Sequence, residues 1–244
     1  MPLELIVDSV AALAERLVRR LEVTARQAIS ARDRFTLAVA GGSVATTMFP
    51  RLAGTPIDWS RTEVFFVDER AVPAGDRESN FRVAHTMLVE HGPLDPAHLH
   101  RMPADLPDLE AAAAQCAVEL EQSLGAPPRL DVALLGMGGD GHVASLFARH
   151  ATLELKDRWV AAVHDSPKPP TRRLTLTLPV LTGAGLVIVA AFGPEKATAV
   201  HDAVTNPESR LPVALVLREA REALLLLDPD AGLLLAEHGR RKQS

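Results

Sequence analysis

The chain alternates between short runs of continuously apolar residues and longer segments with helical periodicity. The apolar runs have the length of strands, and the clearest are Phe35–Ala40, Glu63–Val67, Leu130–Leu135 and Leu186–Ala191. The helical segments are Asp8–Ile29, Ser43–Leu52, Asn80–Leu88 and Asp108–Leu124. Strands that are apolar on both faces suit a parallel sheet covered by helices on both sides. The pattern therefore predicts an α/β fold, a three-layer α/β/α sandwich with a mostly parallel sheet.

Four later segments are also expected to be strands, namely Trp159–His164, Arg173–Thr177, Val213–Leu217 and Leu224–Leu227. The 244 residues contain no internal repeat, no low-complexity tract and no linker that divides them. We therefore expect one domain over residues 1–244.

Composition excludes several classes of function. The formal net charge is −5, so nucleic acid is not an expected partner. The single cysteine, Cys116, cannot form an internal disulfide, and its Ala-rich helical segment suggests a packed side chain rather than a nucleophile. The first 20 residues carry charges every few positions, unlike a secretory signal or a membrane span. We expect a soluble cytoplasmic protein with no membrane partner, either a monomer or a homodimer.

Gly41-Gly42-Ser43 separates the first apolar run from a helix start. In doubly wound α/β folds the ligand lies outside the carboxyl ends of the strands, where this turn is expected. Gly42 allows a tight turn that directs N–H groups toward an anion, and Ser43 adds a hydroxyl at a helix N-terminus. The tripeptide suits a phosphate cradle, although a plain strand-to-helix turn has the same residues.

A second glycine-rich turn, Gly136–Gly141, follows the strand at Leu130–Leu135 and formally matches G-x-G-x-x-G. A dinucleotide site is disfavoured because the Asp140 carboxylate would repel a pyrophosphate. Asp140 and His142 flank Gly141, so the carboxylate can orient an imidazole whose pKa suits proton transfer at neutral pH. An exposed histidine beside a helix-capping aspartate is the alternative reading of the same spacing.

Several cations lie near predicted strand ends. Arg70 belongs to a mixed-charge loop, Asp68-Glu69-Arg70, and Arg172, Arg173 and Lys196 follow later. Each of them can bind an anion or simply face solvent. His98 and His100 share a strand face, but no neighbouring residue completes a metal site, and none is predicted.

Four segments together resemble the 6-phosphogluconolactonase family, namely AVAGGSVATTMFPRL, IDWSRTEVFFVDERAVPAGDRESNFRVAHTMLV, LDVALLGMGGDGHVASLF, and RRLTLTLPVL followed by FGPEK. They occur in order between about residues 37 and 200. The resemblance implies a Rossmann-like α/β sandwich and hydrolysis of 6-phospho-D-glucono-1,5-lactone in the oxidative pentose phosphate pathway. It also implies a sugar-phosphate lactone as the partner, without a metal or an organic cofactor. The segment after about residue 210 lacks the family's aromatic-rich ending.

The resemblance also assigns the site residues. It implies that His142 is the catalytic histidine, with Asp140 beside it, and that Gly42, Ser43 and Arg70 meet the sugar phosphate. Arg172 or Arg173 and Lys196 are expected nearby. A δ-lactone is an activated ester, so one general base that takes a proton from water is sufficient. His142 is expected to deprotonate the water and then protonate the departing ring oxygen, while Arg70 or a loop N–H stabilises the oxyanion.

Two other functions fit the same superfamily. Glucosamine-6-phosphate deaminases also have an Asp-Gly-His loop, but they tend to carry a tyrosine after the Asp-Glu pair, and this chain has Arg70 there and no tyrosine. A non-catalytic sugar-phosphate sensor would carry a DNA-binding module ahead of the first strand, and only 36 residues precede Leu37. Both functions are less favoured than lactone hydrolysis.

Overall fold

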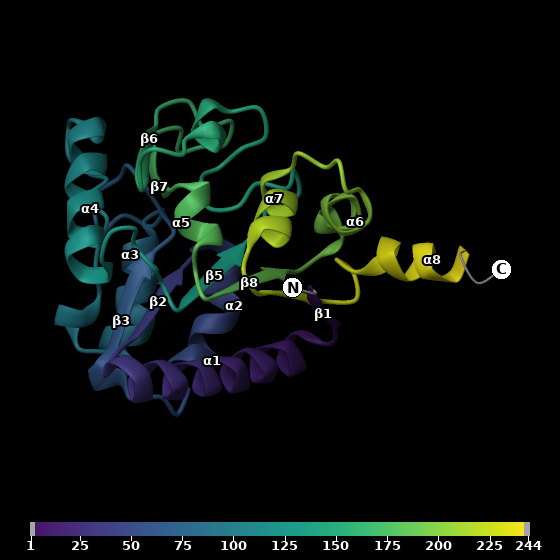
Figure 1. Cartoon of the computed structure of the whole chain (residues 1–244), viewed down its shortest axis with the longest axis horizontal. Helices are drawn as coiled ribbons and strands as arrows, with labels where there is room; N and C mark the ends of the chain where they lie inside the picture. The colour runs from purple at the N-terminus through teal and green to yellow at the C-terminus, as the bar shows by residue number, and fades with distance from the viewer. Residues whose placement is uncertain (1–2, 242–244) are drawn as a thin grey trace.

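The structure is a computed structural model that describes residues 3–241, and its main feature is a sheet of six parallel strands (Figure 1). The strand order is β1-β9-β8-β5-β2-β3. These strands are β1 (Glu4–Val7), β2 (Phe35–Val39), β3 (Thr62–Phe66), β5 (Val132–Gly136), β8 (Leu186–Ala191) and β9 (Ala223–Leu227). The predicted α/β fold with a mostly parallel sheet is confirmed.

Helices cover both faces of this sheet. In Figure 1, α1 runs along one side of the sheet, whereas α5 and α7 lie on the other. The helices are α1 (Val10–Arg32), α2 (Gly42–Leu52), α3 (Asn80–Ala84, continued by a π-helix over His85–Glu90), α4 (Leu109–Leu124), α5 (Leu178–Thr182), α6 (Ala197–Thr205), α7 (Pro212–Glu219) and α8 (Leu233–Arg241). No helix in residues 3–241 combines the length and apolar content that crossing a bilayer requires.

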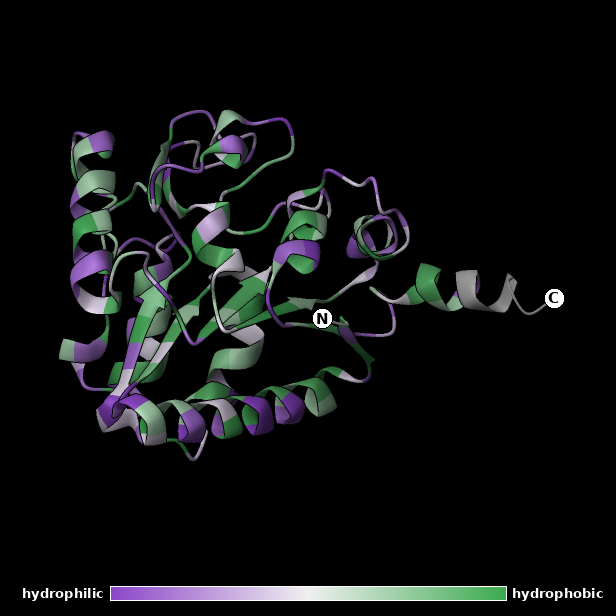
Figure 2. Cartoon of the chain, viewed as in Figure 1, coloured by the Kyte–Doolittle hydropathy of each residue, from purple (hydrophilic) through white to green (hydrophobic). Residues whose placement is uncertain are grey.

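Burial follows the periodicity of the sequence. Leu13, Leu17 and Leu21 on one stripe of α1 are fully buried, and the Ser9 side chain caps this helix by accepting a hydrogen bond from the Ala12 N–H. Every residue of β2 is buried. Figure 2 shows the matching pattern, with hydrophobic strands inside and both hydrophobic and hydrophilic residues along α1. The continuous apolar runs are thus the buried centre of the sheet.

Three elements differ from the expectation, and two of them belong to the main sheet and its helices. Val213–Leu217, predicted as a strand, lies within α7. Pro212 occupies the first turn of this helix, where its fixed φ is favourable and its missing N–H costs nothing. A run of five apolar residues cannot distinguish a buried helix from a buried strand. The edge strand β1 was not expected, because it is short and largely exposed.

A second sheet of three antiparallel strands supplies part of the site. Its order is β4-β7-β6, with β6 at Val160–Val163 and β7 at Arg173–Leu176, and α4 packs against β6 and β7. The third strand, β4, is Asp68–Arg70, which was expected to be a loop. Three charged residues rarely predict a strand, and pairing with β7 determines this one.

Candidate functional site

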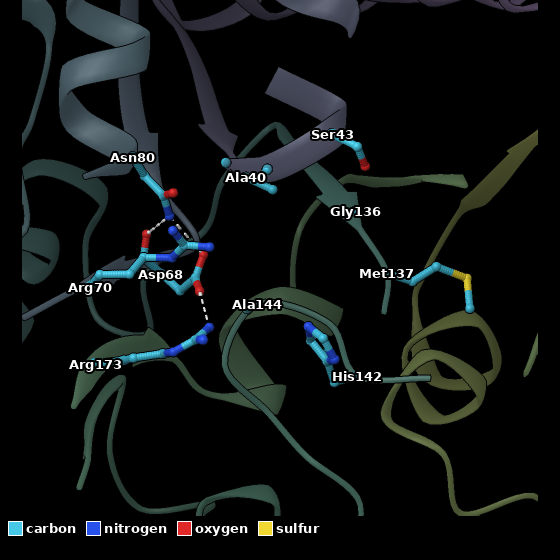
Figure 3. Close-up of a pocket in the computed structure, with 12 residues that line it drawn as sticks. Ala40, Ser43, Asp68, Arg70, Asn80, Gly136, Met137, His142, Ala144 and Arg173 are labelled. Carbon is cyan, nitrogen blue, oxygen red and sulfur yellow. Dashed lines mark hydrogen bonds and ion pairs between the residues drawn. The ribbon is translucent and has the colours of Figure 1, made fainter. Parts of the chain in front are cut away.

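A polar cavity lies at the carboxyl ends of β2 and β5, where the second sheet approaches the first (Figure 3). Its lining residues are Ala40, Gly41, Gly42, Ser43, Asp68, Arg70, Asn80, Gly136, Met137, His142, Ala144 and Arg173. Five of the eight predicted site residues are in this set, namely Gly42, Ser43, Arg70, His142 and Arg173. The carboxyl end of a parallel sheet is the usual ligand position in such folds.

The first glycine turn forms one wall of the cavity. A side chain at Gly41 would place its Cβ 1.8 Å from Oδ1 of Asn80, so only glycine fits there. Gly42 has φ +64°, in the left-handed region, and is the first residue of α2. The side chain of Ser43 is exposed beside this helix N-terminus. The wall therefore combines backbone N–H groups, a hydroxyl and the positive end of a helix dipole.

His142 and Asp140 are hydrogen-bonded to each other. The distance between Nδ1 of His142 and Oδ1 of Asp140 is 2.6 Å. Because a carboxylate accepts, Nδ1 carries the proton and Nε2 carries the lone pair. Nε2 makes no hydrogen bond within residues 3–241, and Figure 3 shows the ring at the cavity. This geometry leaves an oriented base facing the space that a substrate would occupy.

The glycine-rich loop holds this histidine in place. Gly138 donates its N–H to the His142 carbonyl at 2.9 Å, and a side chain at Gly138 would collide with the His142 ring. In the described chain no helix begins directly after Gly141; Met137 and Val143 form a β-bridge there instead. A dinucleotide turn needs that helix, so the G-x-G-x-x-G match has a different role here.

Burial lowers the pKa of His142 below its ordinary value, and the Asp140 carboxylate opposes this change without reversing it. Burial raises the pKa of Asp140, but His142 and Lys168 outweigh that effect, so the pKa of this carboxyl lies below its usual range. At neutral pH the pair is therefore a neutral imidazole beside a carboxylate. This is the protonation state that a general base requires.

The second sheet brings a group of charges to the opposite wall. Arg70 on β4 pairs with Arg173 on β7, and Asp68 lies two residues before Arg70, on the same face of the strand. Asp68 accepts hydrogen bonds from Asn80 Nδ2 at 3.2 Å and from Ser145 Oγ at 2.7 Å. Figure 3 shows Asp68 between Asn80 and Arg173. Oδ2 of Asp68 is also 4.0 Å from Nη1 of Arg173, so the carboxylate offsets part of the charge of that arginine.

Glu69 points to the other face of β4 and fixes this arrangement. Its two carboxylate oxygens accept the N–H groups of Arg70, Asn80 and Phe81 and the hydroxyl of Ser79. The side chain is buried, so these four hydrogen bonds replace its hydration. Glu69 therefore ties the start of α3 to β4 and places both Asn80 and Arg70 in the cavity.

The four predicted cations have different surroundings. Arg70 lines the cavity, and its Nε is a buried donor with no partner in the described chain. Arg173 also lines the cavity but is 4% exposed, and Nε and Nη2 donate to the carbonyls of Lys168, Pro169 and Pro170. Of these two arginines in the described cavity, Arg70 has a donor free for a ligand, whereas most donors of Arg173 are already satisfied.

Arg172 and Lys196 are not in the cavity lining. Arg172 is exposed and donates from Nη2 to the Pro107 carbonyl at 3.1 Å. Nζ of Lys196 is 3.3 Å from Oε1 of Glu195. The Glu195 carbonyl lies against Gly139, so this ion pair is close to the glycine-rich loop. Successive residues of a strand face opposite sides, which explains why Arg173 enters the site and Arg172 does not.

Sequence reasoning missed three polar residues of this region. Asp68 was noted only as part of a charged loop, and Asn80 only as the first residue of a predicted helix. Ser79 caps that helix by accepting the Arg82 N–H. Lys168, from a Pro-rich loop, reaches Asp140 with an Nζ–Oδ2 distance of 3.2 Å. The position of Asp68 at the end of a buried strand is a local sign of a site residue, whereas no local pattern indicated Lys168.

Other reactive groups lie elsewhere. Within residues 3–241 no three His, Cys, Asp or Glu side chains are arranged to hold a metal ion. Cys116 is buried in α4, and burial raises the pKa of its thiol to about 12. A thiol in this state is not a nucleophile at neutral pH.

Comparisons with known proteins agree with one another. The family described as glucosamine-6-phosphate isomerases/6-phosphogluconolactonase matches residues 8–226. A 6-phosphogluconolactonase of Streptomyces coelicolor is 40% identical over 233 residues, which cover 90% of this chain and 89% of that protein. A crystal structure of 6-phosphogluconolactonase from Leishmania guyanensis has a TM-score of 0.81 at 26% identity, covering 95% of this chain and 98% of that one.

A monomeric glucosamine-6-phosphate deaminase is also similar in structure. Its TM-score is 0.80 at 19% identity, covering 95% of this chain and 100% of that chain. Identity at this level shows a shared fold alone. The fold is therefore common to two chemistries, and the residues of the site have to distinguish them.

Proposed function

This chain belongs to the family of glucosamine-6-phosphate isomerases and 6-phosphogluconolactonases, and we propose that it hydrolyses 6-phospho-D-glucono-1,5-lactone to 6-phospho-D-gluconate. Within that family its high-coverage curated relatives are lactonases, so the chain is an enzyme of the lactonase type. The observation that carries the proposal is the hydrogen-bonded pair of Asp140 and His142 at the cavity, in which Nε2 of His142 has no hydrogen bond to the described residues. The reaction would serve the oxidative pentose phosphate pathway.

In the proposed reaction His142 acts as the general base. Nε2 takes a proton from water while the water oxygen bonds to the lactone carbonyl carbon, and the carbonyl oxygen becomes an oxyanion. The C–O bond to the ring oxygen then breaks, and His142 returns its proton to that oxygen. Asp140 would stabilise the imidazolium that exists between the two steps. A positioned base of this kind typically contributes about 10²–10⁴-fold to the rate.

The substrate is proposed to bind through its phosphate and its developing oxyanion. The Gly42 backbone and the Ser43 hydroxyl at the start of α2 suit a phosphate dianion. A dianion needs at least one cation as well, and Arg70, Arg173 and Lys196 are the candidates. Arg70 or a loop N–H would also serve the oxyanion.

The residues favour the lactonase over the deaminase. Asp68-Glu69 is followed by Arg70, where deaminases tend to carry tyrosine, and the chain contains no tyrosine. Val143-Ala144-Ser145 follows His142 in the sequence. The hydroxyl of Ser145 donates a hydrogen bond to the Asp68 carboxylate. Opening a lactone requires only one base and one activated water, and His142 is the proposed base.

The proposed activity can be tested by proton release. Addition of the enzyme to freshly generated 6-phosphogluconolactone should accelerate acid production well above the spontaneous rate, because one carboxylic acid forms for each ester bond cleaved. Glucosamine 6-phosphate is the control substrate, and ammonia release from it is expected to be absent. Ammonia without lactone hydrolysis would identify a deaminase instead.

Removal of metal ions is expected to leave the activity unchanged. The proposed steps use only His142, Asp140 and fixed hydrogen-bond donors, so no Lewis acid is required. Turnover of the lactone should be compared before and after exhaustive treatment with a chelator. A loss that only added zinc or magnesium restores would contradict the mechanism.

A further inference from the structure

Two groups share the carboxylate of Asp140. Oδ1 is 2.6 Å from Nδ1 of His142, and Oδ2 is 3.2 Å from Nζ of Lys168. Lys168 comes from the loop between β6 and β7, whereas the other two residues lie in the loop after β5. The contact therefore joins two segments that are far apart in the sequence, and it involves the carboxylate that is bonded to the proposed base.

The loop that carries Lys168 is held in a defined position. Arg173 donates to the backbone carbonyls of Lys168 at 2.9 Å, of Pro169 at 3.1 Å and of Pro170 at 2.8 Å. Ser166 adds hydrogen bonds from its N–H to the Thr171 carbonyl and from its hydroxyl to the Lys168 carbonyl. Because these contacts use backbone atoms at position 168, the loop does not depend on the lysine side chain for its shape.

The charges around His142 come from several elements. They are Asp140 on its own loop, Asp68 and Arg70 on β4, Arg173 on β7, and Lys168. The ring of Phe147 adds an apolar neighbour, with ring centroids 4.7 Å apart. Asp68 and Arg173 partly offset each other, and Arg70 is directed to Glu78. Among residues 3–241, Lys168 is thus the cation in contact with the His142–Asp140 pair itself.

We propose that Lys168 is a positioning residue, which holds the second oxygen of Asp140, fixes that carboxylate in its hydrogen bond with His142 and keeps the imidazole neutral to lower pH. The inference rests on the proposed role of His142 as the base. Without Lys168 the full negative charge of Asp140 would face the ring and stabilise its protonated form. With Lys168 that charge is shared, so the carboxylate still orients the ring but attracts a proton less strongly.

The electrostatics of the pair agree with this assignment. Burial lowers the pKa of His142, Asp140 raises it, and Lys168 lowers it again. A base that stays neutral over a wider pH range is available in a larger fraction of the molecules. Removing the lysine charge should therefore move the acidic limb of the pH–rate profile to higher pH.

The test is a charge series at this position. Lys168→Met removes the charge, Lys168→Glu reverses it, and Lys168→Arg retains it. Lys156→Met is the matched control, because Lys156 is exposed and has no ion pair in the described part of the chain. NMR titration of the His142 imidazole in the substrate-free protein is measured first, and its resonance is assigned by its absence in His142→Asn.

The midpoint of the His142 titration is expected to rise in Lys168→Met, to rise further in Lys168→Glu, and to stay in place in Lys168→Arg and Lys156→Met. The acidic limb of kcat/KM should shift in the same order. The plateau at higher pH should fall by no more than about tenfold in Lys168→Met, since His142 is neutral there in every variant.

Two results would overturn the inference. One is an unchanged His142 titration in Lys168→Met and Lys168→Glu. The other is a large loss of plateau kcat in Lys168→Met without a change in the profile, which would place Lys168 in contact with the substrate. If His142→Asn itself retains full activity, the proposed base is wrong, but the NMR titration still shows whether Lys168 controls the pair.

Discussion

Replacing His142 with asparagine is expected to lower kcat for the phosphorylated lactone by about 10²–10⁴-fold. Asparagine keeps a side chain of similar polarity but cannot accept a proton from water. The cavity walls at Ser43 and Arg70 do not depend on the imidazole, so binding of 6-phosphogluconate, measured by calorimetry, should be nearly unchanged. In the native protein kcat/KM should fall as the pH decreases through the pKa of His142, because the protonated ring is no longer a base.

His150 provides a matched control for this substitution. It is also paired with an aspartate, with 2.8 Å between Nε2 and Oδ1 of Asp165, but it does not line the cavity. His150→Asn should therefore retain turnover close to that of the native protein. Native turnover in His142→Asn, or an equal loss in both variants, would remove His142 from the mechanism.

Replacing Arg70 with alanine is expected to raise KM for the phosphorylated lactone by roughly 10- to 100-fold. Arg70 lines the cavity, and its buried Nε has no partner among residues 3–241, so a substrate oxygen can satisfy it. A hydrogen bond to a charged group is worth about 1.5–3 kcal/mol, which corresponds to this change in affinity. Plain gluconolactone has no phosphate to hold, so its hydrolysis should change much less.

Arg172 is the matched control, because it is exposed and bonded to the Pro107 carbonyl away from the cavity. Arg172→Ala should have the same KM and turnover as the native protein for both substrates. Arg173→Ala and Lys196→Ala complete the comparison, since either cation can supply part of the charge that a dianion needs. If Arg70→Ala reduces both activities in equal proportion, Arg70 serves the reacting end of the substrate and the phosphate assignment is wrong.

The sequence was informative wherever structure and chemistry are local. Continuous apolar runs predicted the buried parallel strands, because a strand covered on both faces has no polar side. Gly41-Gly42 predicted a turn at a strand end, and the left-handed φ of Gly42 requires that residue. Asp140 and His142 are two residues apart, so their hydrogen bond follows from a single tight loop.

The sequence was least informative where a weak local preference competes with packing. Residues 213–217 are apolar throughout and have no periodicity that distinguishes helix from strand. Asp68–Arg70 has no intrinsic strand preference, and its partner β7 is more than 100 residues away in the chain. In both cases contacts with distant segments contribute more free energy than the local sequence does.

The sequence alone therefore determined the class of fold, the two glycine turns and the hydrogen-bonded pair of Asp140 and His142, all of which depend on neighbours within a few residues. Only the tertiary structure decided which charges share the cavity. Pairing of β4 with β7 turns Arg173 inward and leaves Arg172 outside, and the backbone contacts of Arg173 bring Lys168 to Asp140. Side chains that are remote in sequence meet because the burial of the two sheets fixes how one sheet lies against the other. No local sequence pattern encodes this arrangement of the sheets.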